Sequence, residues 1–183
     1  LEKNREMWAA YGKGEIDRDT LNEERFRYPL ERVGIFDKEL VKNYTASFFE
    51  QIVQNERLMP GAKAVLDNLS QRYPLYIISN GFRELQYKKM ASSSISSYFR
   101  NVYLSDDIGY NKPHPAIFDY ALDDVGVQPN EAVMIGDNWN ADIQGARKIG
   151  MDQVYIASNM RDDAEFSPTH YIRSLEELLL IFE

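Results

Sequence analysis

Apolar residues recur at helical spacing in the first third of the chain. One set lies within residues 21–33 and a second within residues 40–53, and Gly34 separates them. Apolar positions three or four residues apart form one face of a helix, and this part of the chain has no run typical of a strand. We predict a small all-helical domain of about three helices over residues 1–57.

The pattern changes at Pro60-Gly61. From there, short apolar runs of strand length alternate with amphipathic helical segments, which is typical of a parallel sheet with right-handed crossover helices. Strands are predicted at 75–78, 102–104, 132–136, 154–156 and near 171–172, and helices at about 62–72, from 82 to before 92, at 115–125, at 140–149 and from 174. We therefore predict an α/β domain over residues 58–183.

The apolar run Ala132–Ile135 leads into Gly136, Asp137 and, five positions later, Asp142. A strand that is apolar at every position is expected to be buried on both faces. Ligands of such sheets bind at the carboxyl ends of the strands, and two carboxylates there predict ligands for a hard divalent cation. The alternative is that Asp137 only ends the strand, while Asp142 lies in a first helical turn, where its charge suits the dipole.

Polar residues also follow the strand predicted at 75–78. Ser79, Asn80 and Gly81 offer a hydroxyl, an amide and backbone N–H groups, and such neutral donors bind a phosphoryl oxygen. The alternative is ordinary helix capping, for which Ser and Asn are favoured.

Lys112 lies in the sequence Asn111-Lys112-Pro113-His114-Pro115. The two prolines stiffen the loop, so that the ammonium presents a fixed positive charge to a phosphate; the alternative is a surface lysine in a turn. Pro115 is well placed as the first residue of a helix, and we expect His114 to cap that helix rather than to act as an acid or base.

Composition narrows the class of partner. The net charge of −8 argues against a nucleic-acid polymer, which requires a basic face, although local dipoles or a metal still allow a small anionic ligand. The absence of cysteine excludes disulfides and thiolate nucleophiles. No apolar run approaches the roughly 20 residues that cross a bilayer, so we expect no membrane partner and a cytoplasmic location.

Three polar motifs follow one another along the α/β domain: Ser79-Asn80, Lys112-Pro113, and Gly136-Asp137 with Asp142. Their order and spacing resemble the second, third and fourth motifs of the haloacid dehalogenase (HAD) superfamily. The resemblance covers residues 60–183, and the helical front half resembles the cap that these enzymes insert after their first strand. The sequences at 117–122 and 142–146 are similar to the branch that contains pyrimidine 5′-nucleotidases. The resemblance implies an α/β, HAD-like Rossmannoid core of three layers with a small all-helical C1-type cap.

The resemblance also implies a Mg²⁺-dependent phosphatase for a small phosphorylated metabolite, with a nucleoside 5′-monophosphate as one candidate. In the family an aspartate on the first strand attacks phosphorus and becomes an aspartyl phosphate. A second aspartate two positions later protonates the leaving oxygen and then activates water.

The family pattern assigns roles to residues of this chain. Ser79 would bind a phosphoryl oxygen, with Asn80 and Gly81 beside it, and Lys112 would neutralise the nucleophile and the phosphate. Asp137 would bind Mg²⁺ directly. Asp142 would either stabilise the metal site from outside the ligand shell or orient Lys112.

The first motif of the family, Asp-x-Asp at the end of an apolar strand, does not occur in residues 1–183. Asp17-Arg18-Asp19-Thr20 follows polar sequence and is expected to open a helix, not to supply the nucleophile. We expect the nucleophile strand and the first part of the cap to lie upstream of Leu1 in a longer chain. Residues 1–183 alone are then expected to be inactive and poorly stable, because the neighbours of a missing central strand expose backbone groups.

Two other functions stay open. A 2-haloacid dehalogenase shares the Ser-Asn and Lys-Pro motifs but typically carries Ser-Asn where this chain has Gly136-Asp137. Two carboxylates would repel an anionic nucleophile unless a cation lies between them. The other is a catalytically inactive HAD-like binding module. Aromatic residues of the helical domain, such as Trp8 and Phe26, are expected either to help select the ligand or to form the core of that domain.

Overall fold

The computed structural model describes residues 2–54, 57–160 and 164–183. The chain divides into two compact units, Leu1–Glu56 and Arg57–Glu183, and this division falls one residue before the boundary expected from the sequence. Within the described residues, no helix combines the length and the apolar character that crossing a membrane requires.

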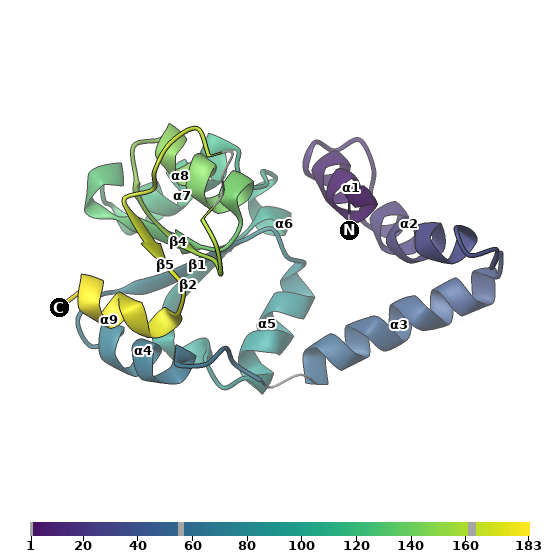
Figure 1. Cartoon of the computed structure of the whole chain (residues 1–183), viewed down its shortest axis with the longest axis horizontal. Coiled ribbons are helices and arrows are strands. Elements are labelled where there is room, and N and C mark those ends of the chain that lie inside the picture. Colours follow the sequence, from purple (N-terminus) through teal and green to yellow (C-terminus); the bar gives the residue numbers. More distant parts are fainter. Residues whose placement is uncertain (1, 55–56, 161–163) are drawn as a thin grey trace. The chain divides into compact units, whose positions relative to one another are not determined.

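The first unit, as far as it is described, consists of three helices, as its helical spacing predicts: α1 (Glu2–Gly12), α2 (Arg18–Glu31) and α3 (Lys38–Gln54) (Figure 1). Helix α2 packs against both α1 and α3. Met7, Leu21 and Val41 are buried, one on each helix, so the apolar core of this unit is small. Asp17 precedes α2 and accepts a hydrogen bond from the Thr20 N–H at 2.8 Å. The prediction that the Asp17 segment opens a helix is therefore confirmed.

The second unit alternates strands and helices. Its strands are β1 (Leu75–Ser79), β2 (Phe99–Leu104), β3 (Val133–Gly136), β4 (Asp152–Ile156) and β5 (His170–Ile172), and its helices are α4 (Ala62–Leu69), α5 (Arg83–Ser92), α6 (Ser105–Ile108), α7 (Pro115–Val125), α8 (Gln144–Lys148) and α9 (Leu178–Ile181). The strand pairs β1–β2, β3–β4 and β4–β5 are parallel, as the alternation predicts. The main difference is β2, which begins three residues earlier than expected.

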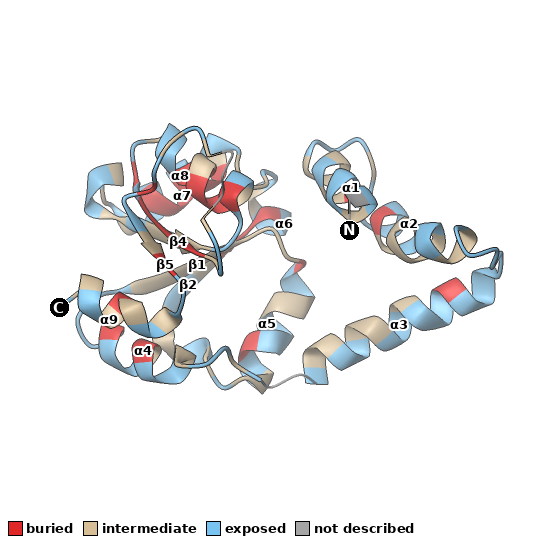
Figure 2. Cartoon of the chain, viewed as in Figure 1, coloured by how far each residue is buried: buried red, intermediate tan, exposed pale blue. Residues whose placement is uncertain are grey.

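Helices cover both faces of these strands, which gives three layers (Figure 1). On one face, Val65 of α4 and Leu178 of α9 pack with Val154 of β4. On the other face, Phe118 of α7 packs with a cluster that includes Met134 of β3. Figure 2 shows buried residues on α7 and α8 and along the strands between the layers. The unit is thus an α/β core with helices on both sides of the sheet.

The strands form two sheets. One sheet is β1–β2 and the other is β3–β4–β5. Among residues 2–54, 57–160 and 164–183, no strand pairs with β1 opposite β2, and none pairs with β3 opposite β4. These two open edges belong to the strands that carry the polar motifs at their carboxyl ends, so the site adjoins an interruption in the sheet.

The prediction that the strand at 132–136 is buried on both faces was wrong. Val133 is 36% exposed, and Met134, Ile135 and Gly136 are half-buried. The strand has a partner on only one edge among the described residues, and an open edge leaves the neighbouring side chains less covered than in the middle of a sheet.

The helix predicted at 140–149 begins irregularly. Its first turn, Trp139–Ile143, is a π-helix, and α8 follows from Gln144. A π-helical turn closes five residues rather than four, and such turns are frequent at functional sites. The widened turn carries Asp142, which is one of the predicted site residues.

Candidate active site

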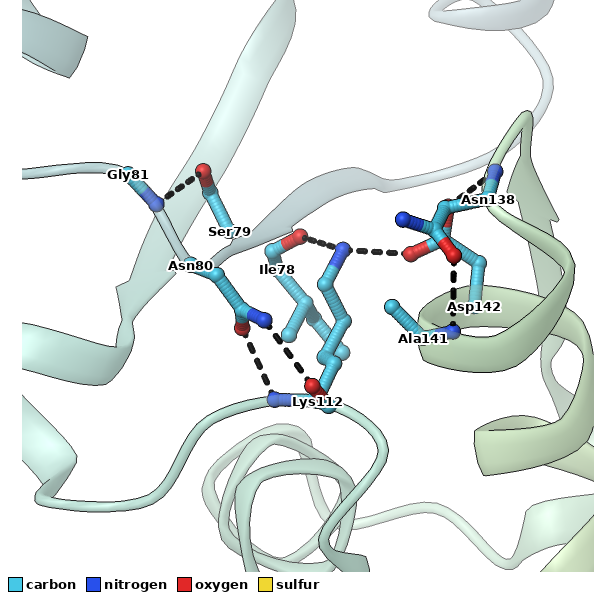
Figure 3. Close-up of polar contacts among 8 residues, drawn as sticks. All are labelled: Ile78, Ser79, Asn80, Gly81, Lys112, Asn138, Ala141 and Asp142. Carbon is cyan, nitrogen blue, oxygen red and sulfur yellow. Dashed lines mark hydrogen bonds and ion pairs between the residues drawn. The ribbon is translucent and has the colours of Figure 1, made fainter. Parts of the chain in front are cut away.

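Lys112 lies at the centre of the polar contacts between the strand ends (Figure 3). Its ammonium donates a hydrogen bond to the Ile78 carbonyl oxygen at 2.6 Å and forms an ion pair with Asp142 Oδ1 at 2.7 Å. The side chains of Lys112 and Asp142 are only 11% and 7% exposed. The alternative of an ordinary surface lysine therefore does not describe this residue. Its ammonium links Ile78 of β1 to Asp142 of the helical turn after β3.

Asn80 holds the Lys112 backbone at two points. Its side-chain amide donates to the Lys112 carbonyl at 2.9 Å, and its Oδ1 accepts from the Lys112 N–H at 2.8 Å. A two-point contact of this kind fixes the residue better than a single hydrogen bond. Asn80 therefore orients the lysine loop from 32 residues away in the chain.

Asp142 is held on its other side by the backbone. Its Oδ2 accepts a hydrogen bond from the Asn138 N–H at 3.0 Å. The opposite oxygen, Oδ1, is buried and meets Lys112 only as an ion pair, with no hydrogen bond from any described residue. A buried carboxylate with a cation partner and free lone pairs is suited to a polar, charged site rather than to a helix start alone.

Gly136 makes the position of Asp142 sterically accessible. A Cβ atom at Gly136 would lie 2.4 Å from Asp142 Oδ2 and 2.5 Å from Asp142 Cβ. Only a residue without a side chain allows this approach. The glycine before the first aspartate thus allows the Asp142 side chain to lie close to the end of β3.

Ser79 and Gly81 form a tight turn after β1. The Gly81 N–H donates to Ser79 Oγ at 3.0 Å, so this N–H is already engaged. Helix α5 begins at Arg83, and Phe82, the residue before it, has no side-chain capping hydrogen bond. The capping alternative for Ser79 and Asn80 therefore does not hold, although the structure gives no direct evidence of phosphate binding.

Asp137 is exposed at the end of β3. It has no hydrogen bond or ion pair with another residue in the described part of the chain, in contrast to Asp142. Within that same part, no three His, Asp or Glu side chains gather into a group able to hold a metal ion. Asp137 is therefore an available carboxylate beside the Lys112–Asp142 pair, but not a complete metal site.

His114 caps α7, as predicted. Its Nδ1 accepts a hydrogen bond from the Ala116 N–H at 3.2 Å, so Nδ1 carries no proton in this arrangement. The ring also stacks on Tyr110, with 4.5 Å between the ring centroids. Its contacts are those of a structural residue on the lysine loop.

Sequence reasoning missed two groups of this site. The first is the Ile78 carbonyl, which carries no side-chain signal in the sequence. The second is Asn138, whose N–H binds Asp142 and whose Oδ1 accepts from the Ala141 N–H at 3.0 Å. An asparagine just before a helix is a recognisable capping signal, so Asn138 was open to prediction.

Comparisons with known proteins define the class. A family model described as haloacid dehalogenase-like hydrolase matches residues 1–150. The chain belongs to this family, and it is a hydrolase with an α/β HAD core and a helical cap. The resemblance drawn from the three motifs is thereby confirmed.

Several relatives are more specific. The HAD-hydrolase YfnB of Bacillus subtilis is 32% identical over 178 residues, which are 96% of this chain and 74% of YfnB. A phosphoserine phosphatase of Thermus thermophilus is 32% identical over 95% of this chain and 72% of its own length. The pyrimidine 5′-nucleotidase YjjG of Escherichia coli is 29% identical over 96% of this chain and 77% of its own length. The similarity to the nucleotidase branch is thus confirmed.

Solved structures agree in fold. The crystal structure of YfnB, described as bound to magnesium, matches with a TM-score of 0.86 and 30% identity over 97% of this chain and 78% of YfnB. A dehalogenase described as an intermediate complex matches with a TM-score of 0.80 and 26% identity over 97% of this chain and 80% of that one. A dehalogenase therefore shares this fold, so the fold alone does not distinguish a phosphatase from a dehalogenase.

Proposed function

We propose that the protein is a Mg²⁺-dependent phosphomonoester hydrolase. The observation that carries this proposal is the Lys112 ammonium, buried and held between the Ile78 carbonyl and Asp142 at 2.6 and 2.7 Å. An ammonium has three donors, so at least one N–H remains for an anion at the strand ends. Phosphoryl transfer depends mainly on charge placed where it develops in the transition state, and this lysine supplies such a charge.

The phosphate is bound by groups around this lysine. Ser79 Oγ accepts the Gly81 N–H, which leaves its own hydroxyl hydrogen to donate to a phosphoryl oxygen. Asn80 keeps the loop in place through its two contacts with the Lys112 backbone. Preorganised donors of this kind need no rearrangement when the substrate binds.

Asp137 would hold the metal. Mg²⁺ is usually bound through one or two carboxylates together with water and substrate phosphate, so an exposed carboxylate with no other partner fits this role better than a cage of several acids. When bound, Mg²⁺ neutralises charge on the phosphoryl oxygens. Asp142, already paired with Lys112, would act from outside the ligand shell and keep the lysine in place.

We place the nucleophile on an additional strand between the open edges of β1 and β3. Both edges lack a partner among the described residues, and Lys112 contacts Ile78 of β1 and Asp142 of the helical turn that follows β3. An aspartate at the end of that strand would attack phosphorus, and the bond to the leaving oxygen would break as a second carboxylic acid protonates it. Water would then hydrolyse the aspartyl phosphate. Residues 1–183 alone are accordingly proposed to be inactive.

The proposed substrates are small phosphomonoesters. Support comes from relatives named as phosphoserine phosphatase, pyrimidine 5′-nucleotidase and glyceraldehyde 3-phosphate phosphatase. A nucleoside 5′-monophosphate is the finer proposal, because the relatives include two pyrimidine 5′-nucleotidases.

The test is phosphate release by the full-length protein over a Mg²⁺ titration, with Asp137→Asn and Asp119→Asn compared. Asp119 is an exposed residue of α7 outside the site. We expect Asp137→Asn to abolish the response to Mg²⁺ and Asp119→Asn to leave it unchanged. Equal activity of wild type and Asp137→Asn at every Mg²⁺ concentration would overturn the metal assignment. Failure to release phosphate from any monoester would overturn the function.

A further inference from the structure

Arg25 of α2 is a cation without an acidic partner among the residues that the structure describes. Its guanidinium carbon lies 5.7 Å from the ring centroid of Trp8, 5.2 Å from that of Phe26 and 5.0 Å from that of Phe48. These rings come from α1, α2 and α3, so the guanidinium lies where the three helices of this unit meet. In the described part of the chain, Arg25 has ring contacts but no hydrogen bond or ion pair.

The sequence explains the missing partner. On a helix, side chains meet those three and four positions away, and around Arg25 these are Leu21, Asn22, Tyr28 and Pro29. None of them is acidic. Arg27, two residues later, instead contacts both Glu24 and Glu31. The same helix thus carries one arginine with two carboxylates and one with none.

Burial makes the isolation of Arg25 costly. The residue is half-buried, and burial lowers the pKa of its guanidinium, with no neighbouring acid to oppose that shift. Aromatic faces attract a cation, but they do not accept the five N–H bonds that lie in the guanidinium plane. Unpaired donors in a partly desolvated site favour an acceptor from outside the described residues.

A second polar group is unsatisfied nearby. Asn22 precedes Arg25 by three residues and therefore lies on the same side of α2. Its Oδ1 is buried and has no hydrogen-bond partner among the described residues. Two polar groups one turn apart on α2 therefore lack a hydrogen-bond or ion-pair partner among the described residues, whereas Arg27 on the same helix is paired twice.

We propose that Arg25 is the anion-binding group of a ligand site in the helical unit, and that its ligand is the carboxylate of a small planar molecule. The guanidinium fork matches a planar carboxylate with two parallel hydrogen bonds. A single guanidinium balances the single charge of a carboxylate, whereas a phosphate brings more charge and more acceptors. The surrounding rings of Trp8, Phe26 and Phe48 offer apolar surface for the body of such a ligand. This site is independent of the phosphatase proposal.

The experiment titrates the protein with benzoate and follows Trp8 fluorescence. Residues 1–183 contain two tryptophans, and Trp139→Phe as background leaves Trp8 as the reporter among them. Benzamide is the neutral analogue, and inorganic phosphate is the competing class of anion. We expect saturable change with benzoate and none with benzamide or phosphate. No saturation with benzoate, or an equal response to either control compound, would overturn the proposal.

Matched variants assign the effect to Arg25. Arg25→Gln is expected to weaken benzoate binding by at least about tenfold, while Arg27→Gln on the same helix leaves it unchanged. Equal affinity in Arg25→Gln and Arg27→Gln would contradict the assignment. Should Arg25→Gln unfold the helices, seen as lost helical circular dichroism, Arg25→Lys decides. Weaker benzoate binding by Arg25→Lys then supports recognition of the carboxylate by the planar guanidinium, and unchanged binding rules that recognition out.

Discussion

Each unit of this protein holds a cation that is partly or largely removed from solvent, but the two units pair it differently. In the α/β unit, Lys112 is held by the Ile78 carbonyl, by Asp142 and, through its backbone, by Asn80. In the helical unit, Arg25 contacts three aromatic rings and, among the described residues, no hydrogen-bond acceptor. The first cation is part of a network within the chain, whereas the second has donors left for a ligand.

The difference follows from how each unit brings residues together. Parallel strands end at one edge of a sheet, so polar residues far apart in sequence, such as Asn80 and Lys112, meet there and can satisfy one another. A helix surface pairs residues three and four positions apart, so a cation with no acid at those positions stays unpaired. Removing the cation should therefore have different consequences in the two units.

The largest effect is expected from Lys112→Met. The substitution leaves the Asp142 carboxylate buried without its cation, which costs roughly 3–5 kcal/mol of unfolding free energy. Urea unfolding, followed by Trp139 fluorescence in a Trp8→Phe background, reports on the α/β unit. Arg83→Met removes the exposed Arg83–Asp107 pair as the control, and we expect a much smaller change there. An equal loss of unfolding free energy in the two variants would contradict the claim that Lys112 neutralises a buried carboxylate.

Gly136→Ala should have the next largest effect. The new Cβ would lie 2.4 Å from Asp142 Oδ2, so the carboxylate has to move away from Lys112 and Asn138. We expect a loss of about 1–3 kcal/mol, measured by the same unfolding. Gly81→Ala is the milder comparison, because its Cβ would come no closer than 3.1 Å to Ser79 Oγ. An unchanged unfolding midpoint in Gly136→Ala would show that Asp142 does not need this close approach.

Arg25→Gln should change stability less than either of these substitutions. No carboxylate is left without a partner, so the loss is limited to ring contacts of the order of 0.5–1 kcal/mol. Urea unfolding followed by Trp8 fluorescence in the Trp139→Phe background measures it. A loss as large as that of Lys112→Met would mean that Arg25 is a structural cation, and the contrast between the units would disappear.

The smallest effect on stability is expected from the Tyr103 hydroxyl, and it is expected at alkaline pH. Burial, and then its hydrogen bond to Asp124, raise the pKa of Tyr103 to about 12. The folded protein therefore keeps this proton more tightly than the unfolded chain, so stability is full below pH 10 and falls as pH rises towards 12. Tyr103→Phe should flatten that fall in the urea midpoint, whereas the exposed Tyr120→Phe should not. If the urea midpoint fell equally with pH in wild type and in Tyr103→Phe, the result would contradict a contribution of the Tyr103–Asp124 hydrogen bond to stability.

Much of the fold could be predicted because it follows from local pattern. The strands at 75–78 and 154–156 and the helix at 115–125 have apolar periods that tertiary contacts did not alter. The prediction that residues 132–136 are buried on both faces was wrong because burial depends on which strands are neighbours. The neighbours of a strand are not a local property of the sequence. The apolar spacing also could not predict the π-helical turn at Trp139–Ile143, since nothing in that spacing distinguishes it from an ordinary first turn of an α-helix.

The site shows the same division. Residue types and spacing singled out Lys112, Asn80 and Asp142, because a lysine followed by two prolines and polar residues after strands are unusual locally. The structure brings these three residues into contact. Residue types and spacing could not show that Asn80 holds the Lys112 backbone or that the Ile78 carbonyl accepts from its ammonium, since both contacts depend on three-dimensional placement. The functional roles of these residues stay predictions, as do those of Asp137, Ser79 and Gly81 and the role of Mg²⁺.

The central claim is that the charges at the strand ends serve phosphoryl transfer and not dehalogenation. The most direct measurement follows two products from one preparation of the full-length protein: inorganic phosphate from a panel of phosphomonoesters, and halide from 2-haloacids, each with Mg²⁺ and with EDTA. We predict phosphate release that requires Mg²⁺ and no halide release under either condition. Halide release that persists in EDTA, without phosphate release, would contradict the account.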